Sequence, residues 1–279
     1  MAASPVIDFV VNWVARCRQN PMINEKQRII LSELIRQYNQ LYKNEPDLHR
    51  YSEYAITYHS TAIEGSTLTE NEVIELLDIG KPAKKRDFLH NLMVFDHHKA
   101  LLYVVEAAKR KENISEKQIQ NISAMVMKNT GSEYNTIAGS FDCSKGEYRL
   151  VGVHAGKRTF PDYRKVPALM ASLIKYIESE QQKQDVDVLQ LAFAVHFRFV
   201  SIHPFADGNG RVARLLMNYI LAYYDLPMLI VFKADRLKYI DTLYKAQENG
   251  NVIPFYTFMM RQYIKFLKYE IKRYKLSSN

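Results

Sequence analysis

Twelve consecutive residues, His203 to Arg214, bring together the side chains of this chain that could do chemistry. The segment reads His-Pro-Phe-Ala-Asp-Gly-Asn-Gly-Arg-Val-Ala-Arg. It contains an imidazole that can accept a proton near neutral pH, a carboxylate, and two arginines whose planar guanidinium groups suit phosphate oxygens. Gly208 and Gly210 leave main-chain N–H groups open to the close approach of an anion. Such a set is typical of a site that holds a polyphosphate and its metal ion beside a base.

A helix is needed to position these groups. Residues 212–224 contain neither Gly nor Pro and are mostly apolar, so the sequence predicts a buried helix directly after the glycine loop. Unpaired N–H groups and the helix dipole favour an anion at such an N-terminus. Arg211 and Arg214 are three positions apart and can share one face, from which both could reach the same anion. Asp207 could hold Mg²⁺, which proteins often bind with one carboxylate plus substrate phosphates.

Each of these features has a commoner explanation when it occurs alone, as a structural histidine, a simple turn or a solvated charge pair. A more specific rival is the dinucleotide fingerprint G-x-G-x-x-G/A, which residues 208–213 also match. In that reading residues 227–232 form a strand and Asp235 binds a ribose. The reading also requires a strand before the loop, whereas residues 188–200 have apolar side chains at the spacing of a helix. We therefore favour the polyphosphate site.

A second motif lies far upstream, from Ser60 to Gly65. Apolar residues recur at helical spacing over residues 50–63, and Ser60 and Glu64, four positions apart, share a face of that helix. Gly65 suits a left-handed conformation at the helix end. Residues 69–72 read Thr-Glu-Asn-Glu and predict a capping box that begins the next helix. Taken alone, Glu64 would be an ordinary solvated carboxylate near a helix end.

The segment His203–Arg214 resembles the signature of the Fic family, H-x-F-x-[DE]-G-N-G-R-x-x-R, and fills every defined position. The similarity covers roughly residues 50–262. It implies an all-α fold, a Fic-type helical bundle with a β-hairpin flap over the active site and an N-terminal helical extension. It also implies transfer of AMP from ATP to a hydroxyl of a protein.

The resemblance implies a role for each motif residue. His203 would deprotonate the Ser, Thr or Tyr hydroxyl of the target, and Phe205 would anchor the loop. Asp207 would hold Mg²⁺ against the phosphates of ATP. The nucleotide would be bound by the nest of Gly208, Asn209 and Gly210, by Arg211 and Arg214 on the outer phosphates, and by Tyr239 against the nucleoside.

The upstream motif resembles the inhibitory motif of the same family, [ST]-x-x-x-E-[GN], with Ser60, Glu64 and Gly65 at its defined positions. The resemblance implies that Glu64 pairs with Arg214 and prevents productive binding of ATP. The chain is thus expected to be a self-inhibited protein adenylyltransferase. Two other functions stay open: removal of AMP at the same site, and a nucleotide-binding regulatory module with little catalysis.

The segment 139–160 predicts the flap. Residues 148–153 and 157–160 have the composition of two strands, and His154 to Gly156 would form the turn between them. The resemblance implies that a hydroxyl-bearing target protein docks on the flap, residues 148–160, by adding a strand. The resemblance also leaves open that the protein modifies itself and that it forms a homodimer.

Helical spacing recurs along the rest of the chain and predicts an almost entirely helical protein. We expect three regions: an N-terminal helical region, residues 1–80, with the inhibitory helix at about 47–65; a catalytic core, residues 81–262; and a C-terminal helix end and tail, residues 263–279. The predicted helices lie near residues 5–18, 24–43, 47–63, 70–78, 87–110, 115–128, 166–181, 186–201, 210–224, 236–248 and 254–276.

Composition limits the remaining possibilities. The chain has 279 residues, of which 47% are hydrophobic, so it can bury a substantial core. The net charge of +8 is scattered rather than gathered on a recognition module, so we expect no nucleic-acid partner. No apolar stretch is long enough to span a membrane, and the N-terminus does not resemble a signal peptide. Cys17 and Cys143 are too few for a disulfide framework or a zinc site, which favours the cytoplasm.

Overall fold

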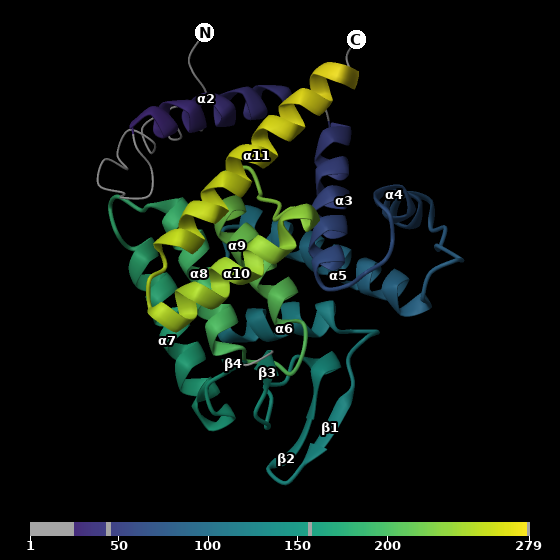
Figure 1. Ribbon diagram of the computed structural model, residues 1–279, viewed down its shortest axis with the longest axis vertical. Coiled ribbons are helices and arrows are strands. Elements are labelled where there is room, and N and C mark those ends of the chain that lie inside the picture. Colours follow the sequence, from purple (N-terminus) through teal and green to yellow (C-terminus); the bar gives the residue numbers. More distant parts are fainter. Residues whose placement is uncertain (1–24, 43–45, 156–157, 278–279) are drawn as a thin grey trace.

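The structure is a computed structural model that describes residues 25–42, 46–155 and 158–277 (Figure 1). Helices dominate the described residues. They are α2 (Glu25–Tyr42), α3 (Pro46–Ile63), α4 (Glu70–Ile79), α5 (Phe88–Lys109), α6 (Glu116–Val126), α7 (Val166–Gln181), α8 (Val188–Ile202), α9 (Asn209–Tyr223), α10 (Arg236–Asn249) and α11 (Ile253–Ser277). Each helix predicted from residue 24 onward is present, with its ends displaced by two residues or fewer. The helix predicted near residues 5–18 lies outside the described residues.

The helices α8 and α9 form the centre of the bundle and lie against each other (Figure 1). Both are buried on nearly every face. The sequence of α8 is accordingly apolar almost all round, whereas α9 also buries the polar side chains of Asn209, Arg211, Arg214 and Asn218. The helix α5 packs on α9, and α7 packs on α8. This arrangement holds the C-terminal end of α8 and the N-terminal end of α9 in a fixed relation, and the motif lies between those two ends.

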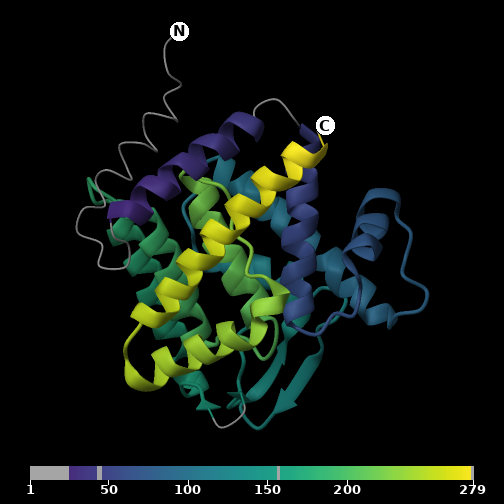
Figure 2. The same cartoon turned by 45° about the horizontal axis from the view of Figure 1, so that its top comes forward.

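The helix α11 crosses the bundle and packs along α2, α10 and α8 (Figure 2). Side chains from all three regions expected from the sequence meet in one hydrophobic core. Leu31 and Ile56 come from the first region, Leu216 from the second and Leu267 from the third. The hydrophobic core is therefore continuous across the boundaries near residues 80 and 262. These boundaries stay a proposed division of the chain by function.

Two antiparallel hairpins lie at one end of the bundle (Figure 1). β1 (Glu133–Thr136) pairs with β2 (Gly139–Asp142), and β3 (His154–Ala155) pairs with β4 (Arg158–Thr159). The hairpin flap is confirmed, but the strand predicted over residues 148–153 is wrong. The main-chain N–H and the guanidinium of Arg149 are used in bonds to other segments, so a strand begins only at His154.

The predicted turn is also corrected. His154 pairs with Thr159 across the hairpin and Ala155 pairs with Arg158, so both residues belong to the strand rather than the turn. Gly156 lies outside the described residues. The hairpin of β1 and β2 was not predicted, because its strands lack the alternation of apolar and polar residues that marks a half-buried strand.

Within the described part of the chain, we find no helix that combines the length and the apolar character needed to cross a membrane.

Candidate active site

The glycine loop lies at the N-terminus of α9, as predicted. Gly208 precedes the helix with a φ of 79°, and its carbonyl accepts the first helical hydrogen bond, from Val212 N–H at 3.0 Å. The earlier N–H groups of the helix have no intrahelical acceptor. The side chain of Asn209 closes the loop, because its Oδ1 accepts from Phe205 N–H at 3.1 Å and its Nδ2 donates to Phe205 O at 2.8 Å. These two bonds fix the shape of the loop at the N-terminus of α9.

His203 ends α8 in a left-handed conformation, with a φ of 53°. Its ring stacks on Phe160 with ring centroids 3.8 Å apart, and its Nδ1 lies 3.4 Å from Val200 O. Burial lowers the pKa of His203 to about 4, and the nearby arginines Arg149 and Arg158 add to this effect. The imidazole is therefore neutral at neutral pH. When Nδ1 donates to the Val200 carbonyl, Nε2 carries the lone pair that can accept a proton.

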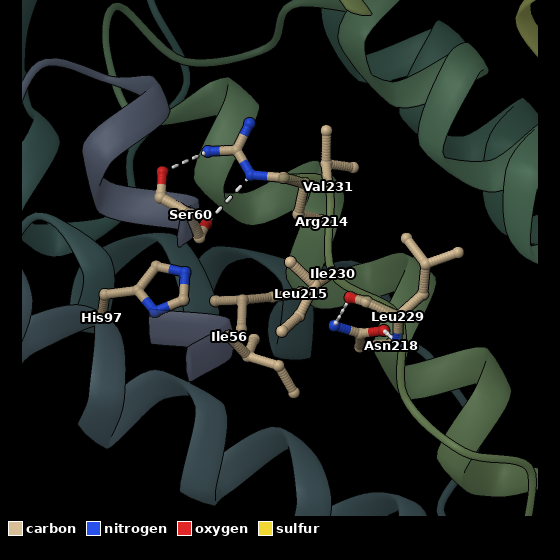
Figure 3. Close-up of a pocket in the computed structure, with 9 residues that line it drawn as sticks. All are labelled: Ile56, Ser60, His97, Arg214, Leu215, Asn218, Leu229, Ile230 and Val231. Atoms are coloured by element: carbon tan, nitrogen blue, oxygen red, sulfur yellow. Dashed lines mark hydrogen bonds between the residues drawn. The ribbon is translucent and has the colours of Figure 1, made fainter. Parts of the chain in front are cut away.

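The guanidinium of Arg214 is held by the end of α3. Its Nε donates to Ser60 Oγ at 2.9 Å, and its Nη2 donates to Ser60 O at 2.9 Å and to Glu64 Oε1 at 2.7 Å (Figure 3 shows the two contacts with Ser60). Burial raises the pKa of Glu64, but the attraction of Arg214, Arg211 and Arg236 outweighs it and lowers that pKa below its usual value. Glu64 is thus an ionised partner of Arg214.

Glu64 also lies against the first turn of α9. A Cβ atom on Gly210 would overlap Glu64 Oε1, so the carboxylate is in close contact with the main chain at residue 210. Gly65 follows with a φ of 105°, as predicted for a residue that ends the helix α3. The glutamate therefore occupies part of the space at the helix N-terminus where an anion would be favoured.

The two motif arginines face different helices in this conformation. Arg211 is only 2% exposed, and it donates through Nη1 to Val126 O at 3.4 Å and through Nη2 to Met127 Sδ at 3.0 Å, at the end of α6. Arg214 instead points to α3. The prediction that both reach the same anion therefore requires a rearrangement of at least one guanidinium.

Asp207 is available to a metal ion, because 65% of its side chain is exposed and its nearest cation is Arg211 Nη2 at 3.8 Å. The described residues contain no group of three or more His, Cys, Asp or Glu side chains that could hold a metal on its own. A single carboxylate that shares the ion with substrate phosphates is a common way for proteins to bind Mg²⁺. The residues present fit a metal that arrives with the nucleotide.

Tyr239 is 3% exposed, and its hydroxyl lies 2.7 Å from His196 Nε2. Its ring offers almost no surface to a ligand in this conformation. The role against the nucleoside stays a prediction.

A small cavity of about 10 Å³ lies behind Arg214, and Figure 3 shows the residues around it. Ser60, His97 and Asn218 are its other polar lining residues. Neither ring nitrogen of His97 has a hydrogen-bond partner among the described residues. A space of this size holds about one water molecule and not a nucleotide. The cavity is lined mainly by apolar side chains, with Arg214 among its few polar residues.

Two residues with marked contacts here were not predicted from the sequence. Arg236 Nε donates to Ile63 O at 2.7 Å and fixes the end of α3. Arg149 is completely buried and contacts both the flap and the end of α8. The only sequence signal for Arg149 was a charged residue within the apolar run of residues 148–153.

Comparison with known proteins agrees with the motif. Residues 113–221 match the model of the Fic/DOC family. A curated relative named Protein adenylyltransferase Fic, from Drosophila persimilis, is 30% identical over 202 residues, which are 72% of this chain and 37% of the relative. The chain thus spans a little over a third of the length of that relative.

Solved structures share the fold. A Fic-domain-containing signaling protein from Bacteroides thetaiotaomicron has a TM-score of 0.75 and 25% identity, over 88% of this chain and 98% of that protein. A Fic-1 fragment from C. elegans has a TM-score of 0.73 and 21% identity, over 98% of this chain and 83% of that fragment. With the complete motif at the junction of α8 and α9, the matches to the family model and to the curated relatives show that the chain belongs to the Fic family.

Proposed function

We propose that this chain is a self-inhibited protein adenylyltransferase, which transfers AMP from ATP to a Ser, Thr or Tyr hydroxyl of a target protein or of itself. The observation that carries the proposal is the ionised Glu64, bound to Arg214 and lying on the anion-binding end of α9. The name of the curated relatives, Protein adenylyltransferase, supports the reaction.

The geometry suits this chemistry. His203 Nε2 accepts the proton of the hydroxyl as its oxygen forms a bond to the α-phosphorus of ATP. The bond from that phosphorus to the β-phosphate oxygen breaks, and pyrophosphate leaves. Mg²⁺ held by Asp207 would neutralise charge on the phosphates, as would Arg211 and Arg214 once they face the site.

The flap is suited to hold the target. Phe160 follows β4 directly and stacks on the ring of His203, so a segment that pairs with the flap would lie next to the base. A two-stranded hairpin has free main-chain groups along its edges and can accept an added strand.

The contact of Glu64 with Arg214 explains how the resting protein would be inhibited. It neutralises a guanidinium needed for the outer phosphates and fills the space above Gly210. ATP would have to displace a buried, charge-assisted hydrogen bond before its phosphates could lie along the loop.

Incubation with ATP labelled at the α-phosphate tests the proposal. We expect Glu64→Gly to label itself at least about tenfold faster than the wild type, and the further change His203→Ala to abolish the labelling. Glu178→Gly, which removes an exposed glutamate near the end of α7, is the matched control and should behave as the wild type. Nucleotide binding without labelling in any variant would contradict transfer and support the regulatory module. Faster loss of AMP from labelled protein in the wild type than in Glu64→Gly would support AMP removal.

A further inference from the structure

Arg149 is among the largest fully buried side chains in the described part of the molecule, with none of its surface exposed. Each hydrogen bond of its guanidinium goes to a main-chain carbonyl, four of them in all. Burial lowers the pKa of Arg149 from its usual range. A buried charge is costly unless its donors are satisfied. The four carbonyls offset that cost for Arg149, and they also tie the residue to the segments that carry them.

One half of these contacts fixes the backbone around the catalytic histidine. Arg149 Nε donates to His203 O at 2.8 Å, and its Nη2 lies 3.5 Å from Ile202 O. Its own main-chain N–H donates to Pro204 O at 3.1 Å. Carbonyls at the end of a helix lack intrahelical donors, and a cation is favoured there by the helix dipole. Arg149 thereby stabilises the left-handed conformation in which His203 leaves α8.

The other half closes the base of the flap. Arg149 Nη1 donates to Val151 O at 2.8 Å and Nη2 donates to Pro161 O at 2.6 Å. These two carbonyls lie on either side of the hairpin formed by β3 and β4. Phe160, which precedes Pro161, stacks on the ring of His203. A single guanidinium therefore joins both ends of the flap to the main chain of His203.

We propose that Arg149 is a positioning residue, which sets the distance and register between the flap and His203 so that a hydroxyl docked on the flap meets the base. The inference rests on the proposed transfer of AMP. Only arginine suits the position, because its planar fork presents donors in several fixed directions, whereas a lysine ammonium on its flexible stem cannot span both segments.

The test uses Arg149→Lys in the Glu64→Gly background. We expect labelling at saturating ATP to fall on the order of 10²-fold, because a misplacement of about 1 Å costs that much. The KM for ATP should stay within about twofold, since Arg149 makes no contact with the loop that binds the phosphates. Arg164→Lys is the matched control, because Arg164 follows the flap and its side chain is 75% exposed.

Hydrogen exchange gives a second readout that does not depend on turnover. In Arg149→Lys we expect faster exchange at the N–H of Phe160, which bonds to Val153 O, and at the N–H of His203, which bonds to Phe199 O. Exchange in the middle of α9 should not change. Phe160→Leu removes the stacking without touching Arg149, and its effect on labelling should be less than additive with that of Arg149→Lys.

The outcomes separate this inference from the proposed function. No labelling by Glu64→Gly itself would refute the transfer of AMP, while the exchange experiment would still test the link between flap and base. Normal labelling and normal exchange in Arg149→Lys would overturn the inference. So would a uniform rise in exchange together with a higher KM for ATP, because that pattern indicates general destabilisation.

Discussion

Glu64 Oε1 accepts a hydrogen bond from Arg214 Nη2 at 2.7 Å, although the two residues are 150 positions apart in the chain. The contact joins the end of α3 to the first turns of α9. It places a carboxylate where the helix favours an anion, and it engages an arginine that a nucleotide would need. Under the proposed function, this contact and a bound nucleotide would compete for the same groups.

Ser60→Ala should weaken the inhibition. Ser60 Oγ accepts from Arg214 Nε, and its loss leaves a buried charged donor unpaired at a cost of about 1–3 kcal/mol. We expect self-labelling to rise, but less than in Glu64→Gly, where the competing charge itself is removed. Ser172→Ala removes an exposed serine of α7 and is the control. Labelling no faster than that of the control would contradict the role of Ser60.

Gly210→Ala should destabilise the wild type by about 1–3 kcal/mol, because the new Cβ would overlap Glu64 Oε1. In the Glu64→Gly background the same change should cost at least ~1 kcal/mol less, since the overlapping atom is gone. Urea unfolding of the four proteins measures the coupling. Equal costs in both backgrounds would show that the carboxylate does not lie on Gly210.

Acid should destabilise the fold. Burial lowers the pKa of five histidines: those of His59, His98 and His203 to about 4, that of His196 to about 3, and that of His97 well below its usual value. The unfolded chain therefore binds more protons than the folded chain below about pH 6.5.

The free energy of unfolding should thus be highest above about pH 6.5 and should fall toward about pH 4, by up to ~1.4 kcal/mol per pH unit for each histidine. Urea unfolding at a series of pH values measures this slope, and His98→Gln should make it shallower. A stability that does not change across the window would contradict the burial of these rings. Because the pKa of Glu64 is lowered, its contact with Arg214 should persist through the upper part of the window.

Asp207→Asn should raise the Mg²⁺ concentration needed for labelling in the Glu64→Gly background, because a neutral amide is a weaker ligand for a hard cation. The side chain is 65% exposed, so stability should change by less than about 0.5 kcal/mol. Asp241→Asn on α10 is the control, with a side chain that is 50% exposed. Identical Mg²⁺ dependence in the two variants would assign the metal to other ligands.

The sequence predicted the helices well because each buries one face, or in α8 and α9 nearly every face, and the spacing of apolar residues records that burial. The prediction that Ser60 and Glu64 lie on the same face of a helix followed from the same periodicity. The capping box at Thr69 was also predictable, since its partner Glu72 is local in sequence.

The flap could not be predicted in detail. Residues 148–153 have the composition of a strand, but the guanidinium of Arg149 donates hydrogen bonds to the carbonyls of His203 and Pro161, which lie outside that segment. Every residue has a main-chain carbonyl, so the partners of Arg149 leave no signal in the sequence. Nothing in the sequence therefore marks Arg149 as the residue that joins Pro161 to His203. The different partners of Arg211 and Arg214 depend likewise on tertiary contacts with α6 and α3.

A structure of Glu64→Gly with Mg²⁺ and a non-hydrolysable ATP analogue tests the central claim most directly. We predict that the triphosphate lies along the N–H groups of residues 208–211, with the α-phosphorus next to His203 Nε2 and Arg214 released from Ser60 onto an outer phosphate. A triphosphate bound elsewhere, with Arg214 still held by Ser60, would contradict the account.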